Sequence, residues 1–414
     1  MTGGIIGGEI PPANVGGRAG VARGPERAGV EESRAHSAPR ALYIHVPFCS
    51  RRCSYCDFAV QATRVAPTRE WLDAVETEAR LLAAERGWTE PLELDTVYVG
   101  GGTPSLLGPG AMAALAERLR PFATWNPSTV EWTCEANPES FTPELAADWR
   151  AAGVNRISLG AQSFHPPALR WMGRLHGPEG PARAMLAARS AGFDNVSVDL
   201  IFGLPERLGR DWGGDLERAL ELEPEHVSLY GLTAEAGAPL GRWVREGRES
   251  LAEEDRYADE YLLAHERLTA AGFVHYEVSN FGLPGRASRH NLVYWTGAPY
   301  AALGPGAHAF YNPLRRWNLR DWRAYREALL EGRLPTEDEE RVDADEAALE
   351  RAWLLLRTKA GFPLPDATAA QRTLAAEWVR RGWARIDRET LRLGAEGWLL
   401  LDRLAVELAS AGEK

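Results

Sequence analysis

The chain has few cysteines and no long apolar segment. Only four of its 414 residues are Cys, too few for a disulfide framework in a protein of this size. No run of 18 apolar residues occurs, so the sequence predicts no membrane-spanning helix. Lys and Arg number 47 against 58 Asp and Glu, and the net charge of −11 argues against broad nucleic-acid binding. We therefore expect an acidic globular protein in a reducing compartment, the cytoplasm.

Residues 1–40 lack aromatic side chains. They contain nine Gly and four Pro, with no Phe, Tyr or Trp. Such a segment cannot bury enough apolar surface to offset the conformational entropy lost on ordering, and it has no apolar core of a signal peptide. We predict a disordered tail over 1–40.

Beyond residue 40, short β-rich runs alternate with amphipathic stretches. The expected strands are 42–46, 96–99, 129–134, 156–159, 195–202 and 226–232. Helices are expected from an N-cap at Thr68 to Gly87, from an N-cap at Thr142 to Gly153, and over 182–191 to Gly192. Strand–helix units in series predict a parallel sheet, because parallel neighbours need crossover connections. The pattern fits a barrel-like (β/α)6 sheet or an open doubly wound sheet.

The alternation fades beyond about residue 240. Helices are expected over 253–271 and 343–360, with a segment rich in Gly, Pro and aromatic residues over 275–313. The segment 366–412 reads as a helix, a turn, two short strands and a final helix, which is typical of a small winged-helix-like unit. Because it has no strong basic excess, we favour a structural role for this unit over nucleic-acid binding.

Three of the four cysteines lie within eight residues, directly after the first expected strand. Cys49, Cys53 and Cys56 have the spacing CxxxCxxC, whereas Cys134 stands alone in the third strand as a small buried hydrophobe. Three thiolates on one loop can hold three irons of a [4Fe–4S] cube and leave the fourth iron open to an exchangeable ligand. The alternatives are three buried cysteines or structural zinc, which commonly needs four ligands.

Glycines or polar residues also lie at the ends of the other expected strands. The segment 100–103 lacks the ending of a phosphate-binding loop, but its glycines allow a ligand to approach the backbone closely. The next four strands each carry one polar residue at or near the end: Glu135, Gln162, Asp199 and Thr233. Such residues are often caps, yet a common site explains the series better, because barrel sites form at the carboxyl ends of the strands.

The cysteine spacing resembles that of the radical S-adenosylmethionine (SAM) superfamily. The resemblance implies that SAM chelates the open iron and is cleaved to a deoxyadenosyl radical by an electron from the cluster. It also implies an α/β fold, a partial (β/α)6 radical-SAM barrel. The expected division is a disordered tail (1–40), the partial barrel (41–240), a barrel extension (241–340) and a small C-terminal winged-helix-like domain (341–414).

Five motifs in order resemble the oxygen-independent coproporphyrinogen III oxidase family. They begin at Tyr43, Gly100, Glu135, Arg156 and Asp199, and the match covers roughly residues 41–410. By this resemblance the cluster is bound by Cys49, Cys53 and Cys56. The SAM on the cluster would contact Tyr43, Gly101 and Glu135. The positions that hold a second SAM in the true oxidase correspond to Tyr55, Gly102, Thr103, Gln162, Arg174, Asp199 and Thr233.

One position departs from the oxidase pattern. The true oxidase has a fourth Cys two residues after the third, where this chain has Phe58. The Cys-Asp-Phe ending is similar to the HemW branch of the family, the radical-SAM haem chaperones. The HNxxYW motif that this branch is associated with for haem binding is matched by His290, Asn291, Tyr294 and Trp295.

The haem ligand is left open by the sequence. A neutral imidazole can ligate haem iron, and aromatic rings can pack on the macrocycle, but a histidine among aromatic residues is otherwise a hydrogen-bonded core residue. His308 and His45 compete with His290, although His45 better suits a role in orienting the cluster loop. The resemblance implies a chaperone that passes haem to an acceptor such as a respiratory haem protein, with an electron donor for the cluster. The alternative is an enzyme, the oxidase that decarboxylates coproporphyrinogen III.

Overall fold

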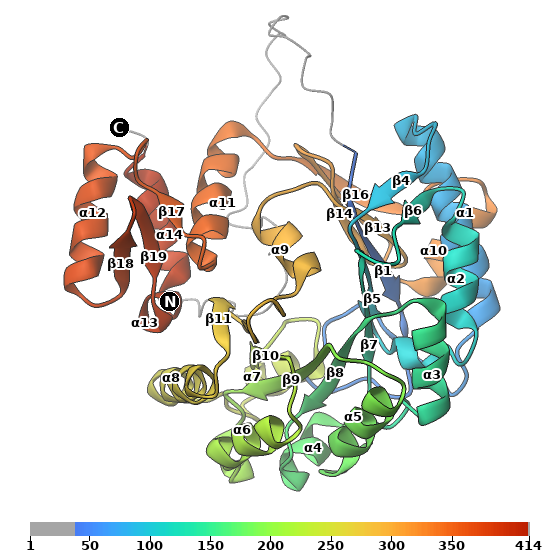
Figure 1. The fold of residues 1–414 in the computed structure, drawn as a ribbon, viewed down its shortest axis with the longest axis horizontal. Helices are drawn as coiled ribbons and strands as arrows, with labels where there is room; N and C mark the ends of the chain where they lie inside the picture. Colours follow the sequence, from blue (N-terminus) through green and yellow to red (C-terminus); the bar gives the residue numbers. More distant parts are fainter. Residues whose placement is uncertain (1–37, 413–414) are drawn as a thin grey trace, which may run out of the picture.

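The computed structural model describes residues 38–412, and in this range one curved sheet of nine strands organises the chain. The strand order is β11-β12-β10-β9-β8-β7-β5-β1-β13 (Figure 1). The order begins at β11 and ends at β13, so the sheet is open, and its parallel part is a partial (β/α)6 barrel as expected. The tail predicted for 1–40 lies outside the described residues, apart from 38–40.

The parallel part of the sheet contains the six strands predicted from the sequence. They are β1 (Ala41–Val46), β5 (Thr96–Gly101), β7 (Glu131–Ala136), β8 (Arg156–Gln162), β9 (Val196–Phe202) and β10 (His226–Gly231). Beside β1 a further strand, β13 (Ala301–Leu303), pairs in parallel. At the other edge β12 (Asn280–Gly282) and β11 (Val274–Glu277) continue the sheet in antiparallel order.

The predicted ends of several strands were wrong. Glu135 is the penultimate residue of β7 and Gln162 is the last residue of β8, so neither follows its strand. Asp199, which was expected near the end of its strand, lies in the middle of β9. Strand β8 reaches Gln162 through a bulge after Gly160. Apolar runs mark where a strand is buried, but polar residues and glycine can extend its hydrogen-bonded ladder beyond that run.

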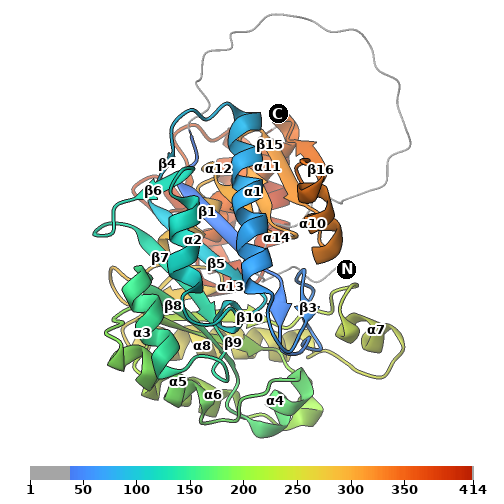
Figure 2. The same cartoon turned by 90° about the vertical axis from the view of Figure 1, so that its right-hand side faces the viewer.

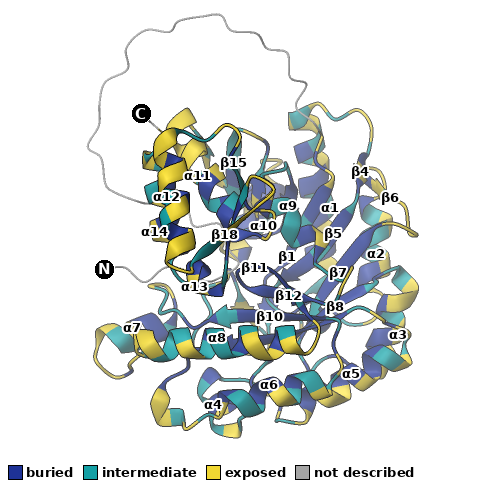
Figure 3. Cartoon of the chain, turned by 60° about the vertical axis from the view of Figure 1, so that its left-hand side comes forward, coloured by how far each residue is buried: buried dark blue, intermediate teal, exposed yellow. Residues whose placement is uncertain are grey.

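Helices cover the outer face of the sheet. Figure 2 shows α1, α2 and α3 side by side on this face. The helices of this region are α1 (Thr68–Arg86), α2 (Ala111–Leu119), α3 (Pro143–Ala152), α4 (Pro166–Met172), α5 (Gly180–Ser190), α6 (Trp212–Glu221), α7 (Pro239–Arg245) and α8 (Glu254–Ala270). In Figure 3 their outer sides are exposed, whereas the strands are largely buried.

A side-chain cap explains where α3 begins, but not where α1 begins. Thr142 is the N-cap of α3 and accepts a hydrogen bond from the backbone N–H of Leu145, as predicted. The prediction for Thr68 was wrong, because Pro67 is the N-cap of α1 and Thr68 is its first residue. The Thr68 hydroxyl donates instead to the carbonyl of Leu107, at 2.8 Å. The local pattern predicted that the Thr68 side chain caps α1, but this side chain hydrogen-bonds Leu107, which is distant in the chain.

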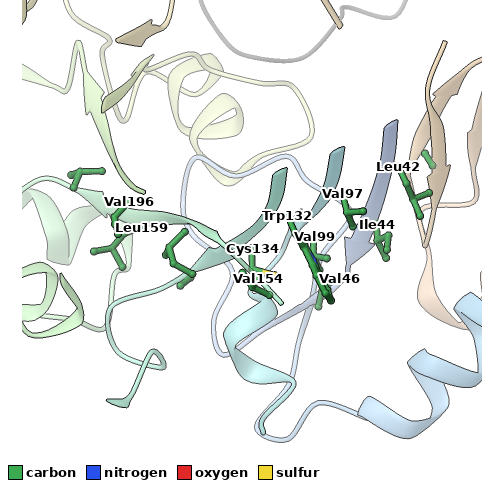
Figure 4. Packing of buried hydrophobic residues seen from close by; sticks show 14 of the residues in the cluster. Leu42, Ile44, Val46, Val97, Val99, Trp132, Cys134, Val154, Leu159 and Val196 are labelled. Atoms are coloured by element: carbon green, nitrogen blue, oxygen red, sulfur yellow. The ribbon is translucent and has the colours of Figure 1, made fainter. Parts of the chain in front are cut away.

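The core lies between the sheet and its outer helices. Figure 4 shows apolar side chains of neighbouring strands, among them Ile44, Val99 and Cys134, meeting in one layer. Cys134 is fully buried and its thiol faces the Met112 sulfur at 3.5 Å, which confirms it as an apolar core residue. Trp71 and Trp149 are also fully buried in this core. The strands that carry the polar site residues thus rest on a close-packed layer.

The rest of the chain adds a helix inside the curved sheet and two small sheets. Helix α9 (Arg289–Trp295) lies on the inner side of the sheet, where it contacts β5 and also α11 (Ala344–Arg357) (Figure 1). One small sheet consists of β14 (His308–Phe310), β15 (Leu314–Asn318) and β16 (Thr336–Arg341). Helix α10 (Trp322–Leu330) connects β15 to β16. The C-terminal elements are β17 (Phe362–Pro363), α12 (Ala369–Arg380), β18 (Ala384–Asp387), β19 (Thr390–Leu393), α13 (Ala395–Trp398) and α14 (Leu401–Ser410).

Within the described part of the chain, no helix combines the length and the apolar character needed to cross a membrane.

Candidate functional site

The cysteine loop follows β1 and is anchored at both ends. Cys49 ends the short strand β2 (Phe48–Cys49), which pairs in parallel with β3 (Gln61–Ala62). Between Cys53 and Cys56, the backbone of Ser54 accepts a hydrogen bond from Leu240 N–H and donates one to the carbonyl of Met172. These contacts tie the loop to α4 and α7. The three cysteines are half-buried free thiols on a backbone held in place by its surroundings.

A polar network connects the cysteines to the ends of the strands. Thr103 Oγ1 donates to Cys49 Sγ at 3.5 Å and accepts from Asn137 Nδ2 at 3.1 Å. The Asn137 side chain in turn accepts from Arg174 Nη2 at 2.6 Å. The other amino group of Arg174 lies 3.9 Å from Cys53 Sγ. A cationic side chain near the sulfurs favours thiolate ligands, which an iron–sulfur cluster requires.

Burial disfavours the thiolate form of two of the loop cysteines. Burial raises the pKa of Cys49 to about 11 and the pKa of Cys56 to about 12. Metal binding must therefore displace these protons, as it does at any thiolate site. Over residues 38–412, no three His, Cys, Asp or Glu side chains converge as they would around one metal ion. Structural zinc commonly takes four ligands, whereas three thiolates suit a [4Fe–4S] cluster with one open iron.

Two glycines at the end of β5 bring the backbone close to the cysteine loop. A Cβ on Gly101, which has φ +103°, would lie 2.2 Å from the His45 ring. A Cβ on Gly102 would lie 2.7 Å from the carbonyl oxygens of Val46 and Phe48. Neither position can hold a side chain, which explains the glycines physically. His45 itself hydrogen-bonds the carbonyl of Ala59 at 2.9 Å and so fixes the end of the cysteine loop.

Glu135 lies beside these glycines as a carboxyl group with a shifted pKa. Its two oxygens accept hydrogen bonds from the Gly101 N–H at 2.9 Å and from the Tyr98 hydroxyl at 2.8 Å. Burial, with a smaller contribution from the charge of the nearby Asp199, raises the pKa of Glu135 to about 7 against the lowering effect of the two hydrogen bonds. The group therefore changes charge near neutral pH, which is common among residues that bind or react.

Gln162 presents an acceptor without a partner. It ends β8 with φ +66°, and its Oε1 is buried with no hydrogen-bond partner within the described range. Arg174 lies alongside and donates to the carbonyl of Gly160 at 2.6 Å. An unpaired buried acceptor costs about 1–3 kcal/mol. A polar ligand that donates a hydrogen bond here would offset that cost.

The other residues expected at the SAM positions have partners within the protein. Asp199 accepts hydrogen bonds from the hydroxyls of Ser158 and Ser197. Thr233 lies beyond the end of β10 and donates to Glu235 at 2.9 Å. The Tyr43 hydroxyl hydrogen-bonds His45 at 2.9 Å. Tyr55 packs against a small apolar cluster that includes Met172.

The HNxxYW segment forms α9, and its histidine is a core residue. His290 is fully buried, and both of its ring nitrogens are hydrogen-bonded, Nδ1 to the Thr96 hydroxyl and Nε2 to the Tyr294 hydroxyl, each at 2.8 Å. The ring stacks on Tyr98 with centroids 5.2 Å apart. Burial lowers the pKa of His290 to about 3, so the ring is neutral.

Trp295, at the other end of α9, is also buried. The guanidinium of Arg357 lies 4.0 Å from the centre of the Trp295 ring. Asn291 and Tyr294 remain partly exposed, and Tyr294 packs edge-on against Tyr300 with centroids 4.6 Å apart. The motif thus contains two buried residues, His290 and Trp295, and two that are partly exposed, of which Tyr294 also hydrogen-bonds the buried His290.

Sequence reasoning missed Tyr98, which lies between the two parts of the site. Its hydroxyl donates to Glu135 and its ring stacks on His290. The alternation of side chains along a strand could have predicted it, because Tyr98 and Gly100 lie two residues apart on β5 and so share one face of the sheet. Arg357 was missed as well, because nothing local in α11 indicates that its side chain reaches Trp295.

Comparison with known proteins identifies the family. The model of the radical SAM superfamily matches residues 43–219. "Heme chaperone HemW" of Mycobacterium tuberculosis is 40% identical over 368 residues, which span 88% of this chain and 93% of that protein. The chain belongs to the heme chaperone HemW family. "Heme chaperone HemW" of Bacillus subtilis is 33% identical over 78% of this chain and 84% of its own length.

A solved structure confirms the fold expected for a HemW-family chain. Coproporphyrinogen III oxidase (HemN) of Escherichia coli superposes with a TM-score of 0.75, over 91% of this chain and 92% of that one, at 20% identity. At this identity the likeness shows a shared fold. Membership of the radical SAM superfamily implies a [4Fe–4S] cluster and SAM. The free thiols, the close backbone at Gly101 and Gly102, and the unpaired acceptor of Gln162 fit such a pair of groups.

Proposed function

We propose that this chain is a [4Fe–4S] radical-SAM haem chaperone, which binds haem and transfers it to an acceptor haem protein, such as a respiratory one, in the cytoplasm. The observation that carries the proposal is the relationship to HemW proteins over nearly their full length. Phe58, in place of a fourth cysteine, supports it. The proposal includes the division of the chain at residues 40, 240 and 340.

Cys49, Cys53 and Cys56 would hold the cluster, and Tyr43, Gly101 and Glu135 would hold SAM. When bound, the cluster and SAM supply one-electron chemistry, while the protein binds and orients them. Gly101 allows the His45 ring to pack against the backbone and holds Glu135 through its N–H, and the Glu135 carboxylate can accept a hydrogen bond from the SAM amino group. The positions that correspond to a second SAM are Tyr55, Gly102, Thr103, Gln162, Arg174, Asp199 and Thr233. Of these, Gln162 has the unpaired acceptor that a polar ligand would satisfy.

Haem would bind beside α9, at the segment that contains His290, Asn291, Tyr294 and Trp295. Tyr294 and Asn291 are partly exposed, and an aromatic ring can pack on a porphyrin. Trp295 and His290 hold the helix against Arg357 and β5. An electron donor for the cluster and the haem acceptor complete the set of proposed partners.

Glu135→Gln is expected to remove most of the pH dependence of SAM binding. In the wild type, SAM affinity should rise as the pH passes through about 7, because Glu135 ionises and its carboxylate then accepts from the SAM amino group. The variant should bind SAM about 10- to 100-fold more weakly above pH 8, the equivalent of one charged hydrogen bond. Equilibrium dialysis of the anaerobically reconstituted protein from pH 6 to 8.5 measures both effects.

The SAM amino group also titrates in this pH range, but it does so equally with both proteins. The ratio of the two dissociation constants therefore isolates Glu135. A ratio that stays constant across the pH range would contradict a direct role for this carboxylate.

A paired assay is expected to separate the chaperone from the oxidase. The reconstituted protein should bind haem stoichiometrically and should convert no coproporphyrinogen III when SAM and reductant are supplied. Appearance of protoporphyrinogen would favour the alternative, an oxygen-independent coproporphyrinogen III oxidase. HemN of E. coli, which has the same fold, serves as the positive control for the enzyme assay.

Haem titration of His290→Ala, in parallel with the wild type, tests whether the HNxxYW segment takes part in haem binding. We expect weaker haem binding in this variant, because α9 loses the hydrogen bond from His290 to Thr96 of β5 and the bond within the helix that holds the Tyr294 hydroxyl. Unchanged haem binding in a folded His290→Ala protein would place the haem site elsewhere.

A further inference from the structure

His290 is poorly placed to ligate haem iron directly. Its ring is fully buried, and both nitrogens are already engaged, with Thr96 and with Tyr294. To bind iron, the ring would have to break one of these bonds and leave its stack on Tyr98. Breaking a buried hydrogen bond leaves an unpaired polar group, at a cost of about 1–3 kcal/mol. The geometry is that of a residue that positions α9.

His308 has the opposite properties. It is exposed on β14 and stacks on Trp317, with ring centroids 5.7 Å apart and planes 18° from parallel. No hydrogen bond reaches its ring nitrogens from any part of residues 38–412. Cover of the ring by its neighbours, with the charges of Arg320 and Arg315, lowers its pKa to about 4. The imidazole is therefore neutral, which is the form that ligates iron.

His308 lies on an aromatic face that continues to the HNxxYW segment. In the β14–β15 pair, His308 is opposite Trp317 and Phe310 is opposite Arg315. Since His308 and Phe310 are two residues apart, all four side chains point to one side of the sheet, with a step of about 7 Å along the strand. Phe310 pairs through its backbone with Tyr300, whose ring packs against Tyr294. We call the surface formed by His308, Phe310, Arg315 and Trp317 the β14 face. Tyr300 itself is buried, and Arg315 forms ion pairs with Glu340 and Glu350.

The end of the β14 face at His308 adjoins the cysteine loop. Arg320 donates a hydrogen bond to the carbonyl of Asp57, which directly follows Cys56. Its guanidinium also lies 3.7 Å from the Asp57 carboxylate, yet half of the side chain is exposed. Haem has two propionate carboxylates, and a guanidinium is the side-chain group best suited to bind them. The face thus offers aromatic rings, a free imidazole and a cation.

We propose that His308 supplies the protein ligand to the iron of the bound haem. The β14 face would hold the haem through His308 and its aromatic neighbours, Arg320 would be available to a propionate, and His290 would position α9. This inference rests on the proposed function, because it concerns the haem that the chaperone would bind. It places the haem next to the loop of Cys49, Cys53 and Cys56.

The test is haem titration with absorption and electron paramagnetic resonance spectra. His308→Phe keeps a ring on Trp317 but cannot ligate iron, so we expect loss of the histidine-ligated spectrum and about 10- to 100-fold weaker haem binding. His165→Ala, which removes a half-buried histidine before α4, should behave as wild type. In His308→Gly, added imidazole should restore the histidine-ligated spectrum.

Two results would overturn the inference. A His308→Phe protein with the wild-type spectrum and affinity would show that another residue ligates the iron, and the proposed chaperone function would stand. A wild-type protein that binds no haem would remove the proposed function, and the ligand assignment with it.

Discussion

Cys53→Ala is expected to lose nearly all cluster-bound iron and sulfide after anaerobic reconstitution. Three thiolates are the smallest set that can hold a [4Fe–4S] cube with one open iron, and Cys53 is the middle of the three. Removing it leaves an iron without a protein ligand, and also removes the sulfur nearest to Arg174. Iron and labile sulfide assays, with the visible charge-transfer absorption, measure the loss.

Cys134→Ala is the matched control for this variant. Cys134 is the fourth cysteine of the chain, fully buried in β7 against Met112, and has no role in the cysteine loop. It should retain the full cluster and lose only about 1 kcal/mol of stability through a small cavity. Full retention of iron and sulfide in Cys53→Ala would refute the three-thiolate assignment. Loss in both variants would mean that the assay reports folding.

The sequence predicted the elements whose signals are local. The N-cap of Thr142 depends on residues a few positions apart, and the structure confirms it. The prediction for Thr68 was wrong because its hydroxyl binds Leu107, which is distant in the chain. Gln162 was placed after its strand because a bulge that extends a ladder has no apolar signature.

The arrangement of the site could be predicted only in part. The motifs identified the residues at the strand ends. The residues that hydrogen-bond or pack against them come from remote segments of the chain, which no local pattern connects. His290 shows this best, since its environment is made by Thr96 and Tyr98 of β5, almost two hundred residues earlier in the chain. The motif suggests an iron ligand, whereas the two hydrogen bonds in the core indicate a positioning residue.

The second large effect is expected at Arg357, which fixes Trp295 from the C-terminal part of the chain. Its guanidinium is fully buried, forms an ion pair with Glu277 at 3.2 Å, and lies against the rings of Trp295 and Trp353. Arg357→Ala leaves Glu277 buried without its cation, which should cost about 3–5 kcal/mol of unfolding free energy. Urea denaturation followed by Trp fluorescence measures this loss.

The pH dependence of Arg357→Ala identifies the cause of its instability. Burial raises the pKa of Glu277 even beside Arg357, and without the cation this pKa should rise further. A raised carboxyl pKa favours the folded state at low pH and disfavours it as the pH rises through that value, so the deficit should grow from pH 5 to 8. The double variant Arg357→Met, Glu277→Gln has no charge left at this buried pair, so most of the unfolding free energy lost in Arg357→Ala should return. A deficit that is equal at all pH values, and that the double variant does not relieve, would assign the loss to the packing of Trp295 and Trp353 on the Arg357 side chain instead.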